Sequence, residues 1–179
     1  MVQLIELFGD RNLVKILNFF LRNPTIQIYQ KDLRKKTKLA KVTSIKWLKV
    51  LTKYELLNLK SFGAAKVYSL NRGNYIVKRI KVLDTILLLT ELKDTSKKYN
   101  IEIYLYGSCA RGEDVEESDV DLLIIGKIKR EEIIKDIIKL SDKTKRKIKF
   151  QIFSSLQWSE MAKKDKAFYE RVEKDKIGI

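Results

Sequence analysis

The first forty residues place apolar and polar side chains at the spacing of a helix. From Leu13 to Phe20 an apolar residue recurs every three or four positions, Asp10 can cap the start of this helix, and Pro24 follows its end. Residues 30–37 (QKDLRKKT) predict a second, short helix whose Leu33 faces the core. The beginning of the chain is therefore expected to be helical.

A third helix is predicted at residues 41–56, and the spacing changes after it. The apolar face of this helix carries Ile45, Leu48 and Leu51. The next segments, LLNLKSF and KVYSL, alternate between apolar and polar residues and flank a turn that contains Gly63. Strand-like alternation on both sides of a glycine turn predicts a β-hairpin.

The net charge of the chain, +15, is distributed unevenly. Residues 1–75 hold 15 of the 38 Lys and Arg and 4 of the 23 Asp and Glu, a net charge of +11, and the remaining +4 falls on residues 76–179. This asymmetry suggests that the N-terminal part meets a polyanion. The alternative is that its lysines form a solvated surface that binds nothing.

The order helix, short helix, helix, hairpin within residues 1–75 resembles a winged helix-turn-helix domain. The resemblance implies that the third helix enters the major groove of double-stranded DNA and that the hairpin contacts phosphates. The residues then expected at the DNA are Lys41, Thr43, Ser44, Lys46, Trp47, Lys60 and Lys66. Such domains also serve as protein-binding modules, in which Trp47 would fill an edge of the core, so this alternative stays open.

Residues 74–100 predict one long helix with apolar positions that include Ile76, Ile80 and Leu83. We expect this helix to begin a second domain, so that the chain divides into residues 1–75 and 76–179. A contribution to a dimer surface is the alternative role for the same helix.

The most informative stretch, IEIYLYGSCARGEDVEESDVDLLIIG, spans residues 101–126. Two buried strands are predicted in it; the first ends at Gly107-Ser108 and the second carries Asp119 and Asp121 near its start. Residues two apart on a strand share a face, so both carboxylates point to one side. Converging carboxylates repel each other unless a cation lies between them, and Mg²⁺ is a hard cation that prefers oxygen ligands. Glycine lets the backbone approach a phosphate closely, and the Ser108 hydroxyl and N–H can then bind that phosphate.

Gly107-Ser108, ten further residues and Asp119-x-Asp121 resemble the GS-x10-DxD motif of the nucleotidyltransferase superfamily that includes DNA polymerase beta. The flanking ARGED and SDVDLLI are similar to the minimal nucleotidyltransferases of prokaryotes. A helix predicted at residues 130–147, a third strand at 148–154 and a last helix at 155–175 continue the resemblance. We therefore expect an α/β (α+β) protein in which a winged helix domain precedes a nucleotidyltransferase fold with a small mixed sheet and flanking helices.

The resemblance also implies a reaction. Asp119 and Asp121 would bind two Mg²⁺ ions, Gly107 and Ser108 would hold the outer phosphates, and a hydroxyl would attack the α-phosphate of a nucleoside triphosphate while pyrophosphate leaves. ATP is the expected nucleotide. Arg111 would either neutralise phosphate charge or pair with an acid of the same loop, Glu113 or Asp114. The loop acids Glu113, Asp114, Glu116 and Glu117 are expected to be solvated, and Cys109 to be a packed residue rather than a nucleophile.

The sequence departs from the family pattern in the third strand. Active members supply a third carboxylate there, as metal ligand and base for the attacking hydroxyl. In the strand KIKFQIF, Lys149, Gln151 and Phe153 share one face, and Gln151 stands where that acid is expected. An amide can coordinate a metal through its oxygen, but it cannot accept a proton at neutral pH. The missing acid therefore counts against catalysis but is compatible with binding of a nucleotide or Mg²⁺.

Two functions from different classes follow. The first is a DNA-binding protein whose nucleotidyltransferase domain transfers a nucleoside monophosphate, with Mg²⁺, to a hydroxyl of a partner protein, as in antitoxin-like relatives, or of an RNA end or a small molecule. The second is a DNA-binding transcriptional regulator whose nucleotidyltransferase domain is degenerate and acts as a nucleotide sensor or docking surface. The intact motif favours the first, whereas Gln151 and the basic N-terminal half favour the second. A homodimer would suit a winged helix that reads paired half-sites.

Composition bears on the compartment. The single cysteine, Cys109, fits a reducing environment, residues 1–12 lack the pattern of a secretory signal, and no apolar run approaches the roughly 20 residues that span a bilayer. We therefore expect a cytoplasmic protein without a membrane partner.

Overall fold

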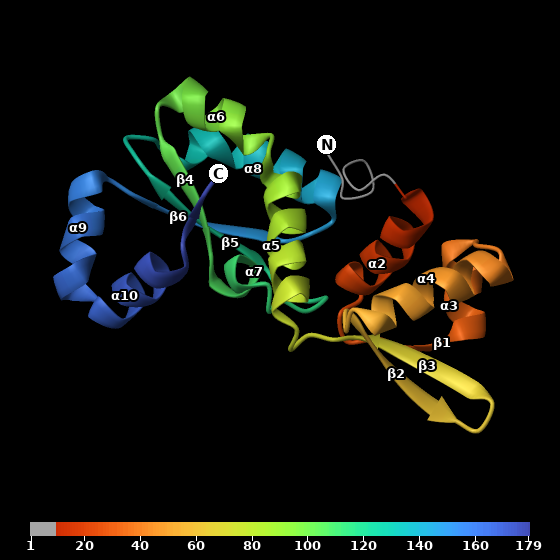
Figure 1. Cartoon of the computed structure of the whole chain (residues 1–179). Helices are drawn as coiled ribbons and strands as arrows, with labels where there is room; N and C mark the ends of the chain where they lie inside the picture. Colours follow the sequence, from red (N-terminus) through yellow and green to blue (C-terminus); the bar gives the residue numbers. More distant parts are fainter. Residues whose placement is uncertain (1–9) are drawn as a thin grey trace. The chain divides into compact units, whose positions relative to one another are not determined.

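The structure, a computed structural model, describes residues 10–179 of the 179-residue chain (Figure 1). Residues 1–9, and with them most of the stretch considered for a secretory signal, lie outside the described residues. The chain separates into two compact units at Lys81 and Val82. This division falls inside helix α5 (Tyr75–Leu89), whereas the sequence interpretation put the boundary at the start of that helix.

The N-terminal unit combines helices with a three-stranded antiparallel sheet of order β1-β3-β2. Its elements are α2 (Arg11–Arg22), β1 (Gln27–Tyr29), α3 (Gln30–Thr37), α4 (Lys41–Lys53), β2 (Leu57–Phe62) and β3 (Ala65–Leu70). The predicted helices and hairpin are confirmed, and β1 is an additional strand. As expected, Asp10 caps α2 by accepting hydrogen bonds from the N–H groups of Asn12 and Leu13, both at 3.0 Å. Gly63 lies in the β2–β3 turn with φ +58°, a left-handed conformation that suits glycine.

The core face of α4 differs by one residue from the predicted one. Leu48 and Leu51 are buried as expected, but the third core position belongs to Ser44, which is 1% exposed, and not to Ile45. Positions 44, 48 and 51 lie on one stripe of a helix, and Ile45 lies about 100° away from Ser44 around the axis. The prediction that Ser44 faces DNA is therefore wrong.

The C-terminal unit is a four-stranded mixed sheet with helices on both faces (Figure 1). The strand order is β6-β5-β4-β7, with β5 parallel to β6 and β4 antiparallel to both of its neighbours. After α5, its elements are α6 (Leu92–Tyr99), β4 (Glu102–Tyr106), α7 (Gly107–Arg111), β5 (Val120–Ile125), α8 (Arg130–Thr144), β6 (Ile148–Phe153), α9 (Ser155–Lys164), α10 (Lys166–Asp175) and β7 (Ile177–Gly178). The expected mixed α/β fold class is confirmed.

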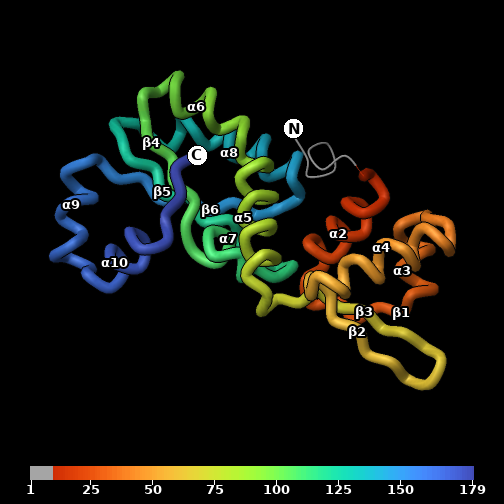
Figure 2. Tube along the Cα trace, viewed as in Figure 1, coloured from red at the N-terminus to blue at the C-terminus, as the bar shows by residue number. Residues whose placement is uncertain are grey.

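The two faces of this sheet carry different clusters. On one face, Leu105, Leu122 and Phe150 pack with buried residues of α6 and α8. On the other face, Leu123 and Ile125 pack with Trp158 of α9 and Val172 of α10. Figure 2 traces α9 and α10 in blue, away from α6 and α8. Asp121 points to the α9–α10 face, because it shares a side of β5 with Leu123, two residues farther on, and Asp119 directly precedes this strand.

Two helices predicted as continuous are each broken in two. Thr90, after α5, donates its hydroxyl to the carbonyl of Leu87 at 2.9 Å, which offers the backbone an alternative to the next helical turn. Asp165 accepts from the N–H of Phe168 at 3.0 Å and thereby caps α10 at the end of α9. The C-terminal residues Ile177–Gly178 then return to the sheet as β7 beside β4.

Helix length also bears on the membrane prediction. No helix within residues 10–179 combines the length and apolar character needed to cross a bilayer.

Candidate functional site

The predicted phosphate turn and the acidic pair meet at one edge of β4 and β5. Tyr106, the last residue of β4, pairs in register with Asp121 of β5. The next residue, Gly107, has φ +76°, and a Cβ placed on it would lie 2.9 Å from Oδ2 of Asp121. The turn therefore passes directly beside the carboxylate, in a conformation and a space that favour glycine.

The short helix α7 holds this turn in place. Cys109 and Ala110 of α7 are buried in the core on the α6–α8 face of the sheet. The Cys109 thiol donates a hydrogen bond to the carbonyl of Asp119 at 3.3 Å. Burial raises the pKa of Cys109 to about 11, so the thiol stays protonated at neutral pH. Cys109 thus acts as a packed link between the turn and Asp119, in agreement with the expectation that it is not a nucleophile.

The residue of β6 nearest to the acids is Lys149. The parallel register pairs Asp121 with Lys149 and pairs Leu123 with Gln151. The Nζ of Lys149 lies 2.5 Å from Oδ2 of Asp119, and Gln151 is instead 3.4 Å from the hydroxyl of Tyr106. The sequence interpretation placed Gln151 beside the acids, whereas the residue in register with Asp121 is Lys149, two positions earlier on β6, because strand order does not reveal the offset between strands.

The two carboxylates have opposite pKa shifts. The hydrogen bond from Lys149 lowers the pKa of Asp119, and a second ammonium, that of Lys147, lies 3.9 Å from Oδ1 of Asp119. Burial, followed by the negative charge of Asp119, raises the pKa of Asp121 against smaller opposing effects of Lys149 and Arg171. Asp121 is thus the more buried and less compensated acid of the pair.

Comparison with protein families matches residues 86–176 to the nucleotidyltransferase domain. The chain belongs to this family. The matched residues contain the turn, the acidic pair and the strand that carries Lys149. Comparisons with curated proteins and with solved structures gave no match.

Asp119 and Asp121 are the acids of the nucleotidyltransferase domain that would hold a metal ion. No group of three or more His, Cys, Asp or Glu side chains placed to hold a metal occurs in residues 10–179. The carboxylates of Asp119 and Asp121 are hard oxygen donors that fit a single Mg²⁺. A second ion does not fit the residues present, because the neighbouring strand presents the ammonium of Lys149 where a third carboxylate would be needed.

Arg111 makes ion pairs with acids of the domain itself. Its Nε lies 3.0 Å from Oε2 of Glu113, in agreement with the expected alternative that Arg111 pairs with an acid of the same loop. Its Nη1 lies 2.7 Å from Oδ2 of Asp175 in α10. The pair with Asp175 was not visible in the sequence, because the two residues lie 64 positions apart. Arg111 therefore connects α7 to α10, and its guanidinium is already engaged beside the turn.

Asp114 is buried, contrary to the prediction of a fully solvated loop. Its side chain is 7% exposed and lies 3.2 Å from Arg146, which also donates to the carbonyl of Ser118 at 3.1 Å. Arg146 therefore fastens the loop that leads into Asp119. The sequence did not indicate this role of Arg146, because nothing in the run KTKRK shows which of its basic side chains is partly buried.

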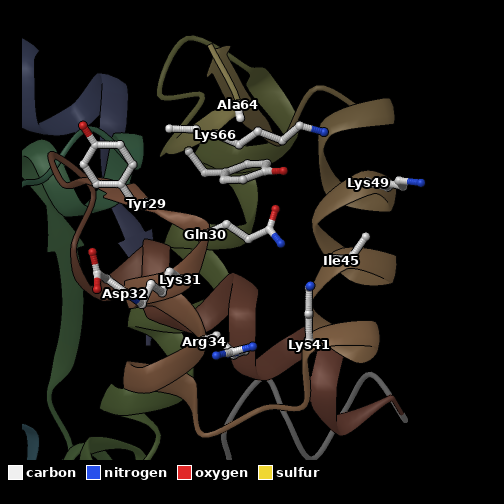
Figure 3. A pocket seen from close by; sticks show the side chains of 12 residues that line it. Tyr29, Gln30, Lys31, Asp32, Arg34, Lys41, Ile45, Lys49, Ala64 and Lys66 are labelled. Carbon is white, nitrogen blue, oxygen red and sulfur yellow. The ribbon is translucent and has the colours of Figure 1, made fainter. Parts of the chain in front are cut away.

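A second candidate site is a basic groove of about 770 Å³ in the N-terminal unit (Figure 3). Its walls come from the start of α3, from α4 and from the β2–β3 hairpin. The charged residues that line it are Lys31, Asp32, Arg34, Lys41, Lys49 and Lys66. Five bases against one acid give the groove a positive potential that suits an anionic ligand.

The residues predicted at DNA divide between the groove and other surfaces. Lys41 and Lys66 line the groove. Four other residues predicted at DNA do not line the groove: Thr43, Lys46, Trp47 and Lys60. Lys46 lies over the ring of Trp47, with Nζ 4.3 Å from the ring centroid. Lys31 and Arg34 line the groove although they were not predicted at DNA; their only signal in the sequence was their positive charge within a short predicted helix. Lys49, on the third predicted helix, also lines the groove.

Proposed function

We propose that the nucleotidyltransferase domain binds a nucleoside triphosphate, with ATP as the expected one, and transfers its nucleoside monophosphate to a hydroxyl acceptor. Family membership supports nucleotidyl transfer in general terms. The observation that carries the specific proposal is the contact between the Gly107 turn and the carboxylate of Asp121. A phosphate bound at this turn would lie beside both acids.

The residues at the turn have distinct roles in this proposal. The N–H and hydroxyl of Ser108 bind the outer phosphates, and Gly107 leaves room for them. Asp119 and Asp121 would hold one Mg²⁺, which supplies charge neutralisation to the phosphates. The acceptor oxygen forms a bond to the α-phosphorus, the bond between the α-phosphorus and the bridging oxygen breaks, pyrophosphate leaves, and the hydroxyl proton passes to solvent. We propose a side chain of a partner protein as the acceptor, with an RNA end or a small molecule as alternatives.

We propose that the N-terminal unit is a winged helix-turn-helix domain that binds double-stranded DNA. The order of its helices and hairpin and the basic groove between α4 and the hairpin support this. Lysine and arginine side chains in the groove would contact phosphates, whereas α4 would approach base edges. Residues 1–75 carry a net charge of +11, which favours association with a polyanion.

The second candidate function is a DNA-binding regulator whose nucleotidyltransferase domain binds a nucleotide without transferring it. Lys149 favours this candidate, because an ammonium beside Asp119 cannot act as the base that a third carboxylate would provide.

Calorimetric titration of ATP with and without Mg²⁺ tests the proposed nucleotide site. We expect Mg²⁺ to strengthen binding in the wild type and Asp119→Ala to abolish this gain. Glu117→Ala is the matched control, since Glu117 is an exposed acid of the same loop and should bind as the wild type does. Equal binding by Asp119→Ala and the wild type would contradict the role of the acidic pair.

Transfer and acceptor class are then measured together. ATP labelled at the α-phosphate is incubated with the protein and cell extract, and the extract is separated into protein, RNA and small molecules. Label in the protein fraction that depends on Asp121 supports the proposed acceptor. Nucleotide binding without label in any fraction would favour the regulator.

DNA binding is measured by fluorescence anisotropy of a labelled duplex over a range of salt concentrations. We expect the logarithm of the affinity to fall linearly with the logarithm of the salt concentration, because phosphate contacts release counterions. No binding even at low salt would contradict the DNA proposal and favour a protein-interaction module.

A further inference from the structure

Lys149 occupies a position at which its charge bears directly on the acidic pair. It lies on β6 in register with Asp121 of the adjacent strand β5. Its ammonium reaches Oδ2 of Asp119 at 2.5 Å, although 57% of the Lys149 side chain remains exposed to solvent. The side chain therefore contacts the acid at its tip while its stem remains accessible.

Lys149 is the close cation of the acidic pair. Lys147 lies farther from Asp119, with its Nζ 3.9 Å from Oδ1 and its side chain 73% exposed, so the direct contact is that of Lys149. A second divalent cation is attracted weakly here, since the ammonium of Lys149 repels that cation and occupies an oxygen that the cation would need.

An ammonium beside the phosphate turn can also bind phosphate. Lysine is a compact charge on a flexible stem with three hydrogen-bond donors, so Lys149 can turn from Asp119 toward an arriving phosphate without moving β6. Asp119 is then released to contact a divalent ion that arrives with the nucleotide. This exchange links the departure of the lysine to the binding of the nucleotide and a single metal ion.

We propose that Lys149 is a built-in cation of the nucleotide site, which releases Asp119 to one divalent ion, binds a phosphate of the nucleotide and supplies the positive charge that a second divalent ion would otherwise bring. The proposal rests on the nucleotide binding proposed above and deepens it. It implies that the site binds nucleotide with one divalent ion, and that a substantial part of the affinity survives when divalent ions are removed.

Two measurements on the full chain test the proposal, with ATP and Mn²⁺ as probes. Calorimetric titration in EDTA measures metal-free affinity for ATP, and electron paramagnetic resonance of Mn²⁺ counts the ions bound per chain at saturating ATP. The variants are Lys149→Gln, Lys149→Asp and the control Lys147→Gln, which removes an equal charge from a more exposed lysine whose side chain is 73% exposed. Thermal unfolding verifies that each variant is folded, and Lys149→Gln carries the test if Lys149→Asp is not.

The expected results differ between the two lysines. The wild type binds ATP in EDTA and holds one Mn²⁺ per chain with ATP. Lys149→Gln lowers the metal-free affinity by about tenfold or more, the usual effect of losing a hydrogen bond to a charged group. Lys147→Gln changes it by less than about twofold, as expected for an exposed charge at longer range. Lys149→Asp gains a second Mn²⁺ because it restores a third carboxylate.

Two outcomes would overturn the role of Lys149 alone. Either the wild type binds two Mn²⁺ per chain with ATP, or Lys149→Gln retains the metal-free affinity of Lys147→Gln while both still bind ATP with Mg²⁺. Absence of ATP binding by the wild type under every condition would overturn the nucleotide site itself, and the inference with it.

Discussion

The acidic site of the C-terminal unit and the basic groove of the N-terminal unit use charge in opposite ways. At the acidic site, Asp119 has a lysine partner at 2.5 Å and Asp114 has an arginine partner at 3.2 Å. In the groove, five bases face one acid and stand largely open to solvent. The acidic site compensates most of its charge internally, whereas the positive charge of the groove is largely exposed to solvent.

This difference separates two kinds of recognition. Charges that are buried and paired fix the geometry of a small site, and their removal affects the fold as well as binding. Exposed charges of one sign create a field that salt screens, and each one contributes a modest, replaceable share. Substitutions in the two regions should therefore give effects of different size and different salt dependence.

The largest effect is expected from Arg146→Ala, which removes the counter-charge of buried Asp114 and the bond to the carbonyl of Ser118. Loss of one partner of a buried ion pair should lower the free energy of unfolding by about 3 kcal/mol, and thereby the melting temperature by roughly 10 °C or more. Scanning calorimetry measures the change. Lys135→Ala, an exposed position on α8, is the control and should melt with the wild type. Equal melting of the two variants would show that internal pairing does not distinguish the acidic site from the groove.

The second effect concerns Gly107→Ala, which places a Cβ 2.9 Å from Oδ2 of Asp121 at a φ of +76°. We expect ATP affinity to fall by more than about tenfold and stability to fall by roughly 1–2 kcal/mol, because both strain and crowding arise there. Gly63→Ala is a matched control, since Gly63 has φ +58° but no atom within 4 Å of the added Cβ. It should lose stability through strain and leave ATP binding unchanged. Loss of ATP binding in both would point to unfolding rather than to the turn.

The third effect tests the groove. Lys41→Ala with Lys49→Ala removes two groove lysines, whereas Lys46→Ala with Lys53→Ala removes the same charge from residues of α4 that do not line the groove. We expect the first pair to reduce the salt slope of duplex binding by about 1.8, roughly 0.9 per lost phosphate contact, and the second pair to reduce it much less. Anisotropy titrations at several salt concentrations measure both slopes. Equal reductions would mean that overall charge, and not the groove, attracts DNA.

The smallest effects are expected from the acids themselves, and their signs should differ. The pKa of Asp121 is raised in the folded protein, so ionised Asp121 costs stability at neutral pH, and this cost disappears as the pH falls below its unfolded pKa. Asp121→Asn should therefore melt a few degrees above the wild type at neutral pH and show no advantage in acid.

Asp119 provides the opposite case within the same site. Its pKa is lowered in the folded protein, so its ionised form contributes stability above the unfolded pKa, and this contribution is lost as the pH falls through the folded pKa. Asp119→Asn should melt slightly below the wild type at neutral pH. Melting curves of both variants across acidic and neutral pH are the measurement, and shifts of the same sign would contradict the opposite environments of the two acids.

The sequence by itself determined the local elements and the motif. Capping by Asp10, the Gly63 turn and the strands around Gly107-Ser108 and Asp119-x-Asp121 depend on neighbouring residues, so their spacing could be interpreted directly. The closeness of Gly107 to Asp121 was also predictable in outline, because Gly107 follows the end of one strand and Asp121 lies at the start of the next. Helix interruptions at Thr90 and Asp165 were missed, since the apolar spacing continues across them.

Tertiary structure alone decided which distant residues meet. The offset between β5 and β6 places Lys149 beside the acids, and packing buries Asp114 against Arg146 and joins Arg111 to Asp175. Shifting β6 by two residues would preserve every apolar position and yet place Gln151 beside Asp121, so no local pattern could choose between the two registers. The orientation of α4 about its own axis likewise decides that Ser44 is buried in the core and that Lys49 lines the groove. Periodicity determines that a face is buried, whereas the shape of the neighbouring elements determines which residues complete it.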